Sequence, residues 1–167
     1  PDENFGKGPV FNIYKDELNP GMAFDGYDPH NVIELEEVVE ADRGNVWKIT
    51  KTADGGNTYL RADKIDLSHW VDGGQLVFDL KVEKGDSELL VKMDSGWPNA
   101  SDITVTKPAK GTWGEVRINI EDLISNGNRF APGNKADINA IGNILVIEPL
   151  GVMTLKLDNI RFEYESK

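Results

Sequence analysis

Residues 72–86 read DGGQLVFDLKVEKGD, and this stretch sets the fold class. Leu76, Phe78, Leu80 and Val82 occupy every second position, and most positions between them are polar. Successive side chains of a strand point to opposite faces of its sheet, so this alternation is typical of a strand with one buried and one exposed face. The glycines at both ends favour tight turns. The stretch therefore predicts a half-buried strand that ends in a turn on each side.

The same alternation recurs along the chain. The predicted strands are 10–14, 31–39, 46–50, 57–61, 75–83, 89–94, 115–120, 144–148 and 154–164. Turn-forming residues separate them at 19–21, 42–45, 54–57, 72–74 and 84–86. Many short strands with frequent turns predict an all-β chain folded as an antiparallel β-sandwich.

Little helix is expected. Residues 121–125, EDLIS, and residues 68–71 each have room for one helical turn. No internal repeat or linker divides the chain, so residues 1–167 are predicted to form a single domain.

The last predicted strand changes face part-way along. The leucines of 155–157 stand at odd-numbered positions, whereas the apolar residues of 160–164 stand at even-numbered positions. A β-bulge adds one residue to a strand and re-aims every side chain beyond it, so a bulge is predicted between Asp158 and Asn159. The Asp158 carboxylate would then either ligate a hard cation or accept a hydrogen bond from nearby backbone.

The chain is acidic, with 18 Lys and Arg against 29 Asp and Glu and a net charge of −11. Phosphate binding needs a basic face, so this balance argues against nucleic acid and anionic lipid as partners. No apolar run approaches the roughly 18 residues that span a membrane. The chain begins at Pro1 without Met or an apolar signal stretch, so we expect a processed or excised piece of a longer protein.

Several classes of catalytic site are absent from the sequence. The chain has no Cys, which excludes thiol nucleophiles, disulfides and Cys-based metal sites. His30 and His69 form no HExxH pair, and no phosphate-binding loop, dinucleotide-binding glycine motif or GxSxG elbow is present. Among so many carboxylates any two can be nominated as acid and base, so the count alone does not point to a glycosidase.

Charged residues stand at outward positions of three predicted strands. Asp79 and Lys81 face the same way on one strand, Lys92 and Asp94 on a second, and Glu148 is a candidate on a third. A solvated sheet face carries charges of this kind. The alternative is a concave platform, because sugar hydroxyls need fixed carboxylates, amides and ammonium groups as partners. Both interpretations stay open from these residues alone.

Trp97 differs from the other three tryptophans in its surroundings. Small and polar residues flank it in the stretch 94–102, DSGWPNASD, so its ring either folds back on the sheet edge or is displayed as a contact. Tyr27, within FDGYDP at 24–29, is a second candidate for display. Flat aromatic rings pack on the C–H groups of a pyranose face, so displayed rings would complete a sugar-binding platform.

Several segments together resemble β-sandwich carbohydrate-binding modules. They are IDLSHW (65–70), GGQLVFDLKV (73–82), KMDSGWP (92–98), GTWGEV (111–116) and LDNIRF (157–162). The opening residues 10–20 and DRGNV at 42–46 also fit, so the resemblance covers about residues 10–164. The most similar family is the galactose-binding-like module attached to bacterial laminarinases and related β-glucan-, agar- or alginate-degrading enzymes.

The resemblance implies a jelly-roll, galactose-binding-like sandwich without catalytic activity. It also implies a structural calcium ion, with Asp16 and Asp158 at the matching positions and Asn45, in the loop 42–45, completing the site. Related modules often carry a Cys pair around the Trp-Pro loop, where this chain has Ser95 and Asn99. The implied protein is secreted or at the bacterial cell surface. Its implied partners are a polysaccharide or oligosaccharide and the catalytic domain of a parent enzyme.

Taken together, these features predict a module that binds a neutral β-glucan, with a β-1,3-linked chain such as laminarin as the first candidate. Agar, mixed-linkage glucan, xylan and alginate are alternative ligands. The predicted ligand-binding residues are Trp97, Tyr27, Asp94, Lys92, Asp79, Lys81 and Glu148. Two rival hypotheses are a small glycan-active enzyme and a structural accessory domain that binds no sugar.

Overall fold

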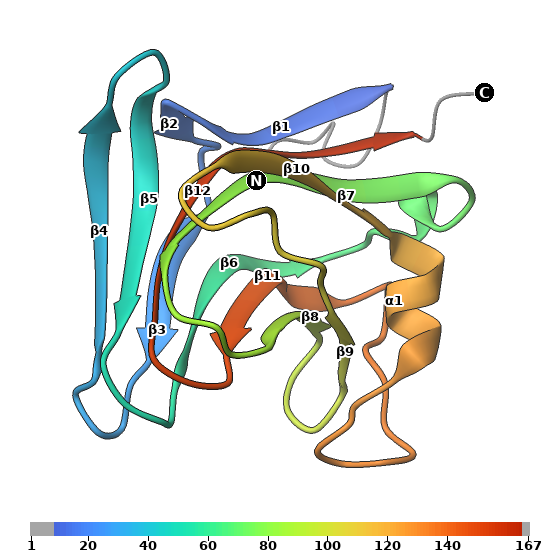
Figure 1. Cartoon of the computed structure of the whole chain (residues 1–167). Coiled ribbons are helices and arrows are strands. Elements are labelled where there is room, and N and C mark those ends of the chain that lie inside the picture. The colour runs from blue at the N-terminus through green and yellow to red at the C-terminus, as the bar shows by residue number, and fades with distance from the viewer. Residues whose placement is uncertain (1–8, 165–167) are drawn as a thin grey trace.

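The computed structural model describes residues 9–164, which form two antiparallel sheets packed against each other (Figure 1). The larger sheet contains β1 (Val10–Lys15), β2 (Glu17–Leu18), β4 (Ile33–Glu40), β5 (Gly44–Lys51), β7 (Gly74–Lys84), β10 (Trp113–Asn119) and β12 (Met153–Tyr164). The smaller sheet has the order β3 (Ala23–Tyr27), β6 (Asn57–Ile65), β11 (Ile141–Pro149), β8 (Leu89–Asp94) and β9 (Ala100–Thr104). The predicted antiparallel β-sandwich is confirmed.

The inner faces of both sheets form the core. The four alternating apolar side chains of β7 are each at most 2% exposed, as the period-two pattern predicts. Trp70 is fully buried in a short 3-10 helix, Ser68–Trp70, and its ring stacks on Tyr164 with centroids 4.5 Å apart. Removal of this apolar surface from water is the main force that holds the two sheets together.

Three strands do not follow from the sequence pattern: β2, β3 and β9. β3 has the sequence AFDGY and β9 the sequence ASDIT, and neither alternates apolar and polar residues. These strands form because neighbouring strands offer them ladder hydrogen bonds, which no local pattern reports. As a result, Tyr27 stands at the end of a strand rather than in a loop. Helix α1 (Ile120–Asn126) lies where a helical turn is predicted, and no helix among residues 9–164 is long and apolar enough to cross a membrane.

The predicted bulge in β12 is confirmed. The register of β12 against β7 shifts between Asp158 and Arg161, and Asn159 has a φ of 50°. The Asp158 Oδ1 atom accepts a hydrogen bond from the Asn159 amide at 2.8 Å, so the backbone alternative for this carboxylate is realised. The bulge keeps apolar side chains buried on both sides of it, because it restores the inward parity. The other partner of β12 changes there from β5 to β1.

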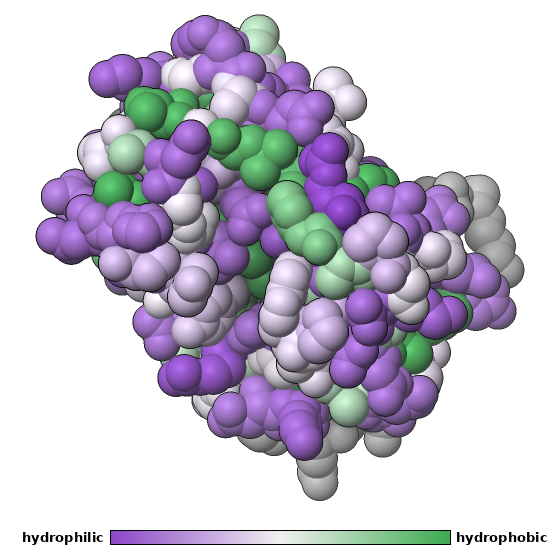
Figure 2. All heavy atoms as spheres, turned by 90° about the horizontal axis from the view of Figure 1, so that it is seen from below, coloured by the Kyte–Doolittle hydropathy of each residue, from purple (hydrophilic) through white to green (hydrophobic). Residues whose placement is uncertain are grey.

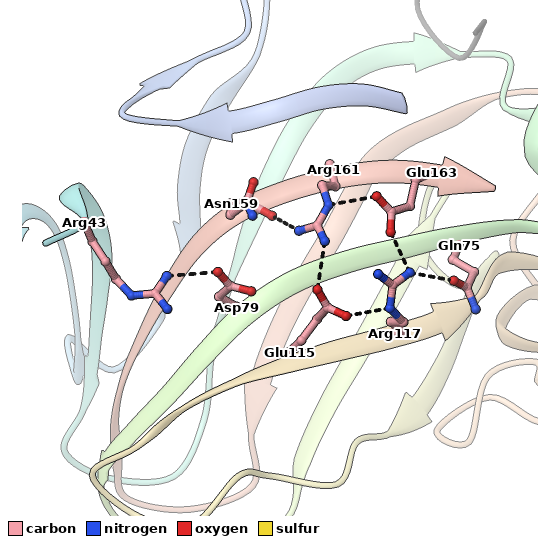
Figure 3. Close-up of polar contacts among 8 residues, drawn as sticks. All are labelled: Arg43, Gln75, Asp79, Glu115, Arg117, Asn159, Arg161 and Glu163. Carbon is pink, nitrogen blue, oxygen red and sulfur yellow. Dashed lines mark hydrogen bonds and ion pairs between the residues drawn. The ribbon is translucent and has the colours of Figure 1, made fainter. Parts of the chain in front are cut away.

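The turn between β4 and β5 is anchored on the outer face of the larger sheet. The Arg43 guanidinium lies 2.9 Å from the Asp79 carboxylate (Figure 3). It also lies 3.1 Å from the Asp158 carboxylate. The same guanidinium stacks 3.9 Å from the centre of the Trp113 ring. Arg43 therefore ties the hairpin to three strands of the sheet beneath it.

Glu40, at the end of β4, anchors the same hairpin. Its Oε1 atom accepts hydrogen bonds from the Lys81 ammonium and the Trp113 indole, each at 3.0 Å, and its Oε2 atom lies 2.8 Å from the Lys156 ammonium. Burial raises the pKa of Glu40, but the hydrogen bonds from Lys156, Lys81 and Trp113 outweigh it and lower the pKa to about 2. The ionised form is thus strongly stabilised in the folded state.

A second charged group lies on the same sheet, across β10 and β12. Glu115, Arg117, Arg161 and Glu163 form a closed ring of ion pairs across β10 and β12 (Figure 3). Gln75 and the Asn159 carbonyl accept further hydrogen bonds from its two arginines. The outer face of the larger sheet therefore satisfies its charges largely within itself.

The Glu40 cluster predicts acid sensitivity. In the folded state the pKa of Glu40 lies below its ordinary value of 4.5, so its ionised carboxylate stabilises the fold fully at pH values above 4.5. This stabilisation is lost as the pH falls toward about 2. We expect Glu40→Gln to lower the free energy of unfolding at pH 7, and to make that free energy fall less steeply between pH 5 and pH 2, as measured by urea denaturation. Glu34→Gln, on an exposed residue of the same strand, is the control. Equal stability of Glu40→Gln and wild type at pH 7 would contradict the prediction.

Candidate functional site

A cleft of about 800 Å³ lies on the outer face of the smaller sheet. Figure 2 looks onto this side of the molecule from below and shows hydrophilic and hydrophobic surface next to each other around a hollow. The floor is formed by outward side chains of β6, β11 and β8, and its polar members are Asn57, Tyr59, Lys92, Asp94, Asn143 and Glu148. Register places Tyr59, Val146 and Lys92 in one row across these three strands.

Three aromatic rings stand around this floor with large exposed areas. Trp97 is 62% exposed, Tyr27 60% and Phe130 52%. Tyr27 ends β3, Trp97 lies in the loop between β8 and β9, and Phe130 lies in the loop after α1. Large apolar side chains gathered around one cleft mark a surface that makes contacts. Of the two alternatives left open for Trp97 and Tyr27, display at the surface is the one that the structure shows.

The polar floor is held in fixed directions by its own hydrogen bonds. Glu148 accepts a hydrogen bond from the Asn57 amide at 3.2 Å and lies 3.3 Å from the Lys92 ammonium. The Asn143 amide donates to the Asp94 carboxylate at 2.9 Å. A carboxylate has lone pairs for several donors, so both acids keep acceptor capacity for a ligand's hydroxyl groups.

Lys92 occupies the centre of the arrangement. Its side chain is 6% exposed, and its ammonium lies 4.6 Å from the centre of the Phe130 ring and 5.6 Å from that of Trp97. A cation near two ring faces is attracted to both of them. The structure thus brings together five of the predicted residues: Trp97, Tyr27, Lys92, Asp94 and Glu148.

Asp79 and Lys81 do not belong to this platform, and the expectation that they share it is wrong. Both lie on β7 in the other sheet, where Asp79 pairs with Arg43 and Lys81 with Glu40. Period-two alternation tells which side chains of a strand point outward, but it does not tell which of the two sheets the strand joins. For these two residues the other interpretation holds, which is a sheet face whose charged side chains pair with one another.

Eight residues that line the cleft were not among the predicted ligand contacts, and four of them carry an aromatic ring or a polar side chain: Phe130, Tyr59, Asn57 and Asn143. Phe130 carried a usable signal, because it stands among polar and small residues in a long loop, as Trp97 does. The other three are ordinary outward residues of strands. Only the pairing of β6, β11 and β8 brings them under the aromatic rings.

The turn of residues 54–56 forms the rim beside Tyr27. Gly56 has a φ of +88°, and a Cβ there would stand 2.5 Å from the Tyr27 carbonyl oxygen, so the close approach requires glycine. The ammonium of Lys51, which is 3% exposed, donates to the carbonyl oxygens of Gly56 at 3.0 Å and Pro149 at 2.5 Å. Burial lowers the pKa of Lys51. This lysine fixes the rim to the end of β11.

Hydrogen bonds close the Trp97 loop in the absence of a disulfide. The Ser95 amide and hydroxyl both donate to the Asn99 carbonyl oxygen, at 2.9 and 3.1 Å. The Ser95 hydroxyl also accepts a hydrogen bond from the Asp137 amide at 2.8 Å. The two positions where the resembling family carries cysteines are therefore still joined here.

The residues predicted to hold calcium do not fit that ion as their side chains stand. Asp16 and Asn45 do meet, since the Asn45 amide donates to Asp16 Oδ1 at 3.0 Å. Asp158, however, has one oxygen engaged by Arg43 and the other by the Asn159 amide. In the described range 9–164, no three His, Asp or Glu side chains are grouped as a metal site. The calcium ion stays an expectation from the resemblance alone, and the present partners of Asp158 argue against it.

Solved structures share this fold at low sequence identity. A family 30 carbohydrate-binding module of a Clostridium thermocellum cellulosomal cellulase superposes with a TM-score of 0.71 at 19% identity, covering 95% of this chain and 99% of that one. A family 11 module from the same organism, in complex with a β-1,3-1,4-mixed-linked tetrasaccharide, has a TM-score of 0.66 at 13% identity, covering 95% and 97%. The extra C-terminal domain of an exo-1,3/1,4-β-glucanase from a Pseudoalteromonas species has a TM-score of 0.69 at 11% identity, with 94% of each chain covered.

These likenesses confirm the sandwich fold that the resemblance implied. No protein-family model matches the chain, and no curated protein matches it significantly by sequence.

The two hydrogen-bond donors to Asp158, the Arg43 guanidinium and the Asn159 amide, predict how the melting temperature responds to a chelator. A ligand that binds only the folded chain raises the melting temperature, so removal of a structural calcium ion would lower it. Because Arg43 already supplies the positive charge beside Asp158, we expect EDTA to leave the melting temperature unchanged. Arg43→Met, which leaves Asp79 and Asp158 facing each other without their cation, should lower it. A fall in the melting temperature with EDTA that added calcium reverses would establish the calcium site instead.

Proposed function

We propose that this chain is a non-catalytic carbohydrate-binding module whose cleft binds a neutral β-glucan. The observation that carries the proposal is the arrangement of Trp97, Tyr27 and Phe130 around a floor of fixed hydrogen-bonding groups. Such rings pack on the C–H faces of sugar rings, while amides and carboxylates bind hydroxyl groups at the sugar edges. The two kinds of contact are what a pyranose chain requires of its binding site.

The charge of the cleft favours a neutral ligand over an anionic one. Its floor carries two carboxylates, Asp94 and Glu148, against the one ammonium of Lys92, which is already paired with Glu148. The chain as a whole carries a net charge of −11. A polyanion such as alginate would meet repulsion both at long range and at contact.

The dimensions of the cleft suit a chain of several sugar units. Tyr27 stands on β3 and Lys92 on β8, three strand spacings away in the sheet order, which is about 14 Å. A β-1,3-linked chain such as laminarin remains the first candidate. The family 11 module that holds a mixed-linked tetrasaccharide, and the domain from an exo-1,3/1,4-β-glucanase, support mixed-linkage glucan as the second.

The role we infer for such a module is to hold a secreted polysaccharide-degrading enzyme on its substrate. The family 30 and family 11 neighbours are modules of cellulosomal cellulases, and the Pseudoalteromonas domain belongs to a glucanase. The partner of this chain would then be the catalytic domain of a parent enzyme. In the cleft itself, Asp94 and Glu148 are each held by an amide as hydrogen-bond acceptors, which suits binding.

Affinity electrophoresis tests the proposal directly. We expect laminarin or barley mixed-linkage glucan in the gel to retard the chain, and alginate to leave its mobility unchanged. Titration calorimetry should then show that Trp97→Ala or Phe130→Ala weakens binding about 10-fold or more, the effect of losing one buried aromatic contact. Val39→Ala, at an exposed apolar residue of β4 outside the cleft, is the control and should bind as wild type does.

Two outcomes would contradict the proposal. If none of laminarin, mixed-linkage glucan, agarose or xylan retards the chain, the hypothesis of a structural accessory domain that binds no sugar replaces it. If the chain alone releases reducing sugar from laminarin, the module is an enzyme.

A further inference from the structure

Two of the aromatic rings of the cleft depend on loops rather than on strands for their position. Trp97 lies in the loop between β8 and β9, and Phe130 lies in the long loop between α1 and β11. Both rings are more than half exposed, so side-chain packing holds them weakly. Their placement relative to each other must therefore come from polar contacts that join the two loops.

Asn128 makes such a contact with both loops at once. Its side-chain NH₂ group donates to the Pro98 carbonyl oxygen at 2.9 Å, and Pro98 directly follows Trp97. Its side-chain oxygen accepts a hydrogen bond from the Phe130 amide at 2.9 Å. A single planar amide thus bridges the backbones next to the two rings.

Asn128 is also held firmly in its own place. The residue is 4% exposed, and its backbone amide donates to the Asn134 carbonyl oxygen at 2.9 Å. The neighbouring Arg129 amide donates to the buried Asp102 carboxylate at 2.9 Å, which docks the loop on β9. A buried amide with both ends satisfied holds its partners at a fixed distance, and its loss leaves their polar groups without partners.

The floor of the cleft shows what this spacing achieves. The Lys92 ammonium lies within cation–π range of both rings. Trp97 and Phe130 are therefore presented over the same part of the floor, where one ligand chain would meet both.

We propose that Asn128 is a positioning residue for ligand binding, which sets the spacing of the Trp97 and Phe130 rings without touching the ligand. This inference rests on the proposed function. Removal of the Asn128 side chain should weaken binding because the two rings lose their relative position, and not because Asn128 itself loses a contact with the ligand. Two separate substitutions can distinguish its two bonds, because the amide donates to one loop and accepts from the other.

Three variants test the inference by titration calorimetry with whichever glucan the wild type binds, laminarin or barley mixed-linkage glucan. Asn128→Ala removes both bonds and should weaken binding about 10-fold, as the loss of one ring would. Asn128→Asp keeps an acceptor for the Phe130 amide but has no donor for the Pro98 carbonyl. Only the loop that carries Trp97 should therefore lose its hydrogen bond to residue 128. Asn134→Ala is the matched control, because that side chain donates within its own loop, to the Ala131 carbonyl oxygen. It should bind as wild type does.

A double-mutant cycle separates positioning from a general loss of stability. If Asn128 acts through Trp97, adding Asn128→Asp to Trp97→Ala should weaken binding no further, whereas adding it to Phe130→Ala should. Additive losses with Trp97→Ala would overturn the inference, as would wild-type affinity in Asn128→Asp. If Asn128→Ala does not fold, the cycle with Asn128→Asp still decides. Failure of the wild type to bind any glucan would instead count against the proposed function.

Discussion

The structure depends on the burial of one face of most of its long strands against the opposite sheet. This constraint leaves each sheet with one face exposed to water, and the polar residues of the alternating pattern gather there. The two outer faces of the sandwich meet this condition in different ways. On the larger sheet, charges of opposite sign lie next to one another across β7, β10 and β12 and pair among themselves. On the smaller sheet, carboxylates and amides line a cleft and keep hydrogen-bonding capacity for a ligand.

The bulge in β12 links burial to the geometry of the larger sheet. By restoring the inward parity after Asp158, it lets one long strand contribute apolar residues to the core on both sides of the shift. The outward Asp158 carboxylate is then available to Arg43, which reaches it from the turn between β4 and β5. A local irregularity of one strand therefore provides an attachment point for a hairpin that is far away in sequence.

The cleft combines parts of different rigidity. Its floor stands on paired strands, where the ladder hydrogen bonds fix the side-chain directions. Its aromatic rings stand at a strand end and on two loops, so they rely on individual polar contacts such as those of Ser95 and Asn128. Lys51 makes a similar polar contact at the opposite rim, where it joins the turn at Gly56 to the end of β11. Polar side chains that hydrogen-bond to loop backbone thus give this site its shape, in a chain that has no disulfide.

The sequence by itself determined the sandwich, most of the strands and the bulge at Asp158, since each depends on a pattern of neighbouring residues. It also singled out Trp97 and Tyr27 as candidates for display. It could not show that Asp79 and Asp94 stand on different sheets, because alternation reports the face of a strand and not its partners. Nor could it reveal β3 and β9, which lack alternation, or that Tyr59 and Asn143 lie under the rings. Strand pairing brings together residues that are far apart along the chain, and for that reason only the tertiary structure decided which side chains share the cleft.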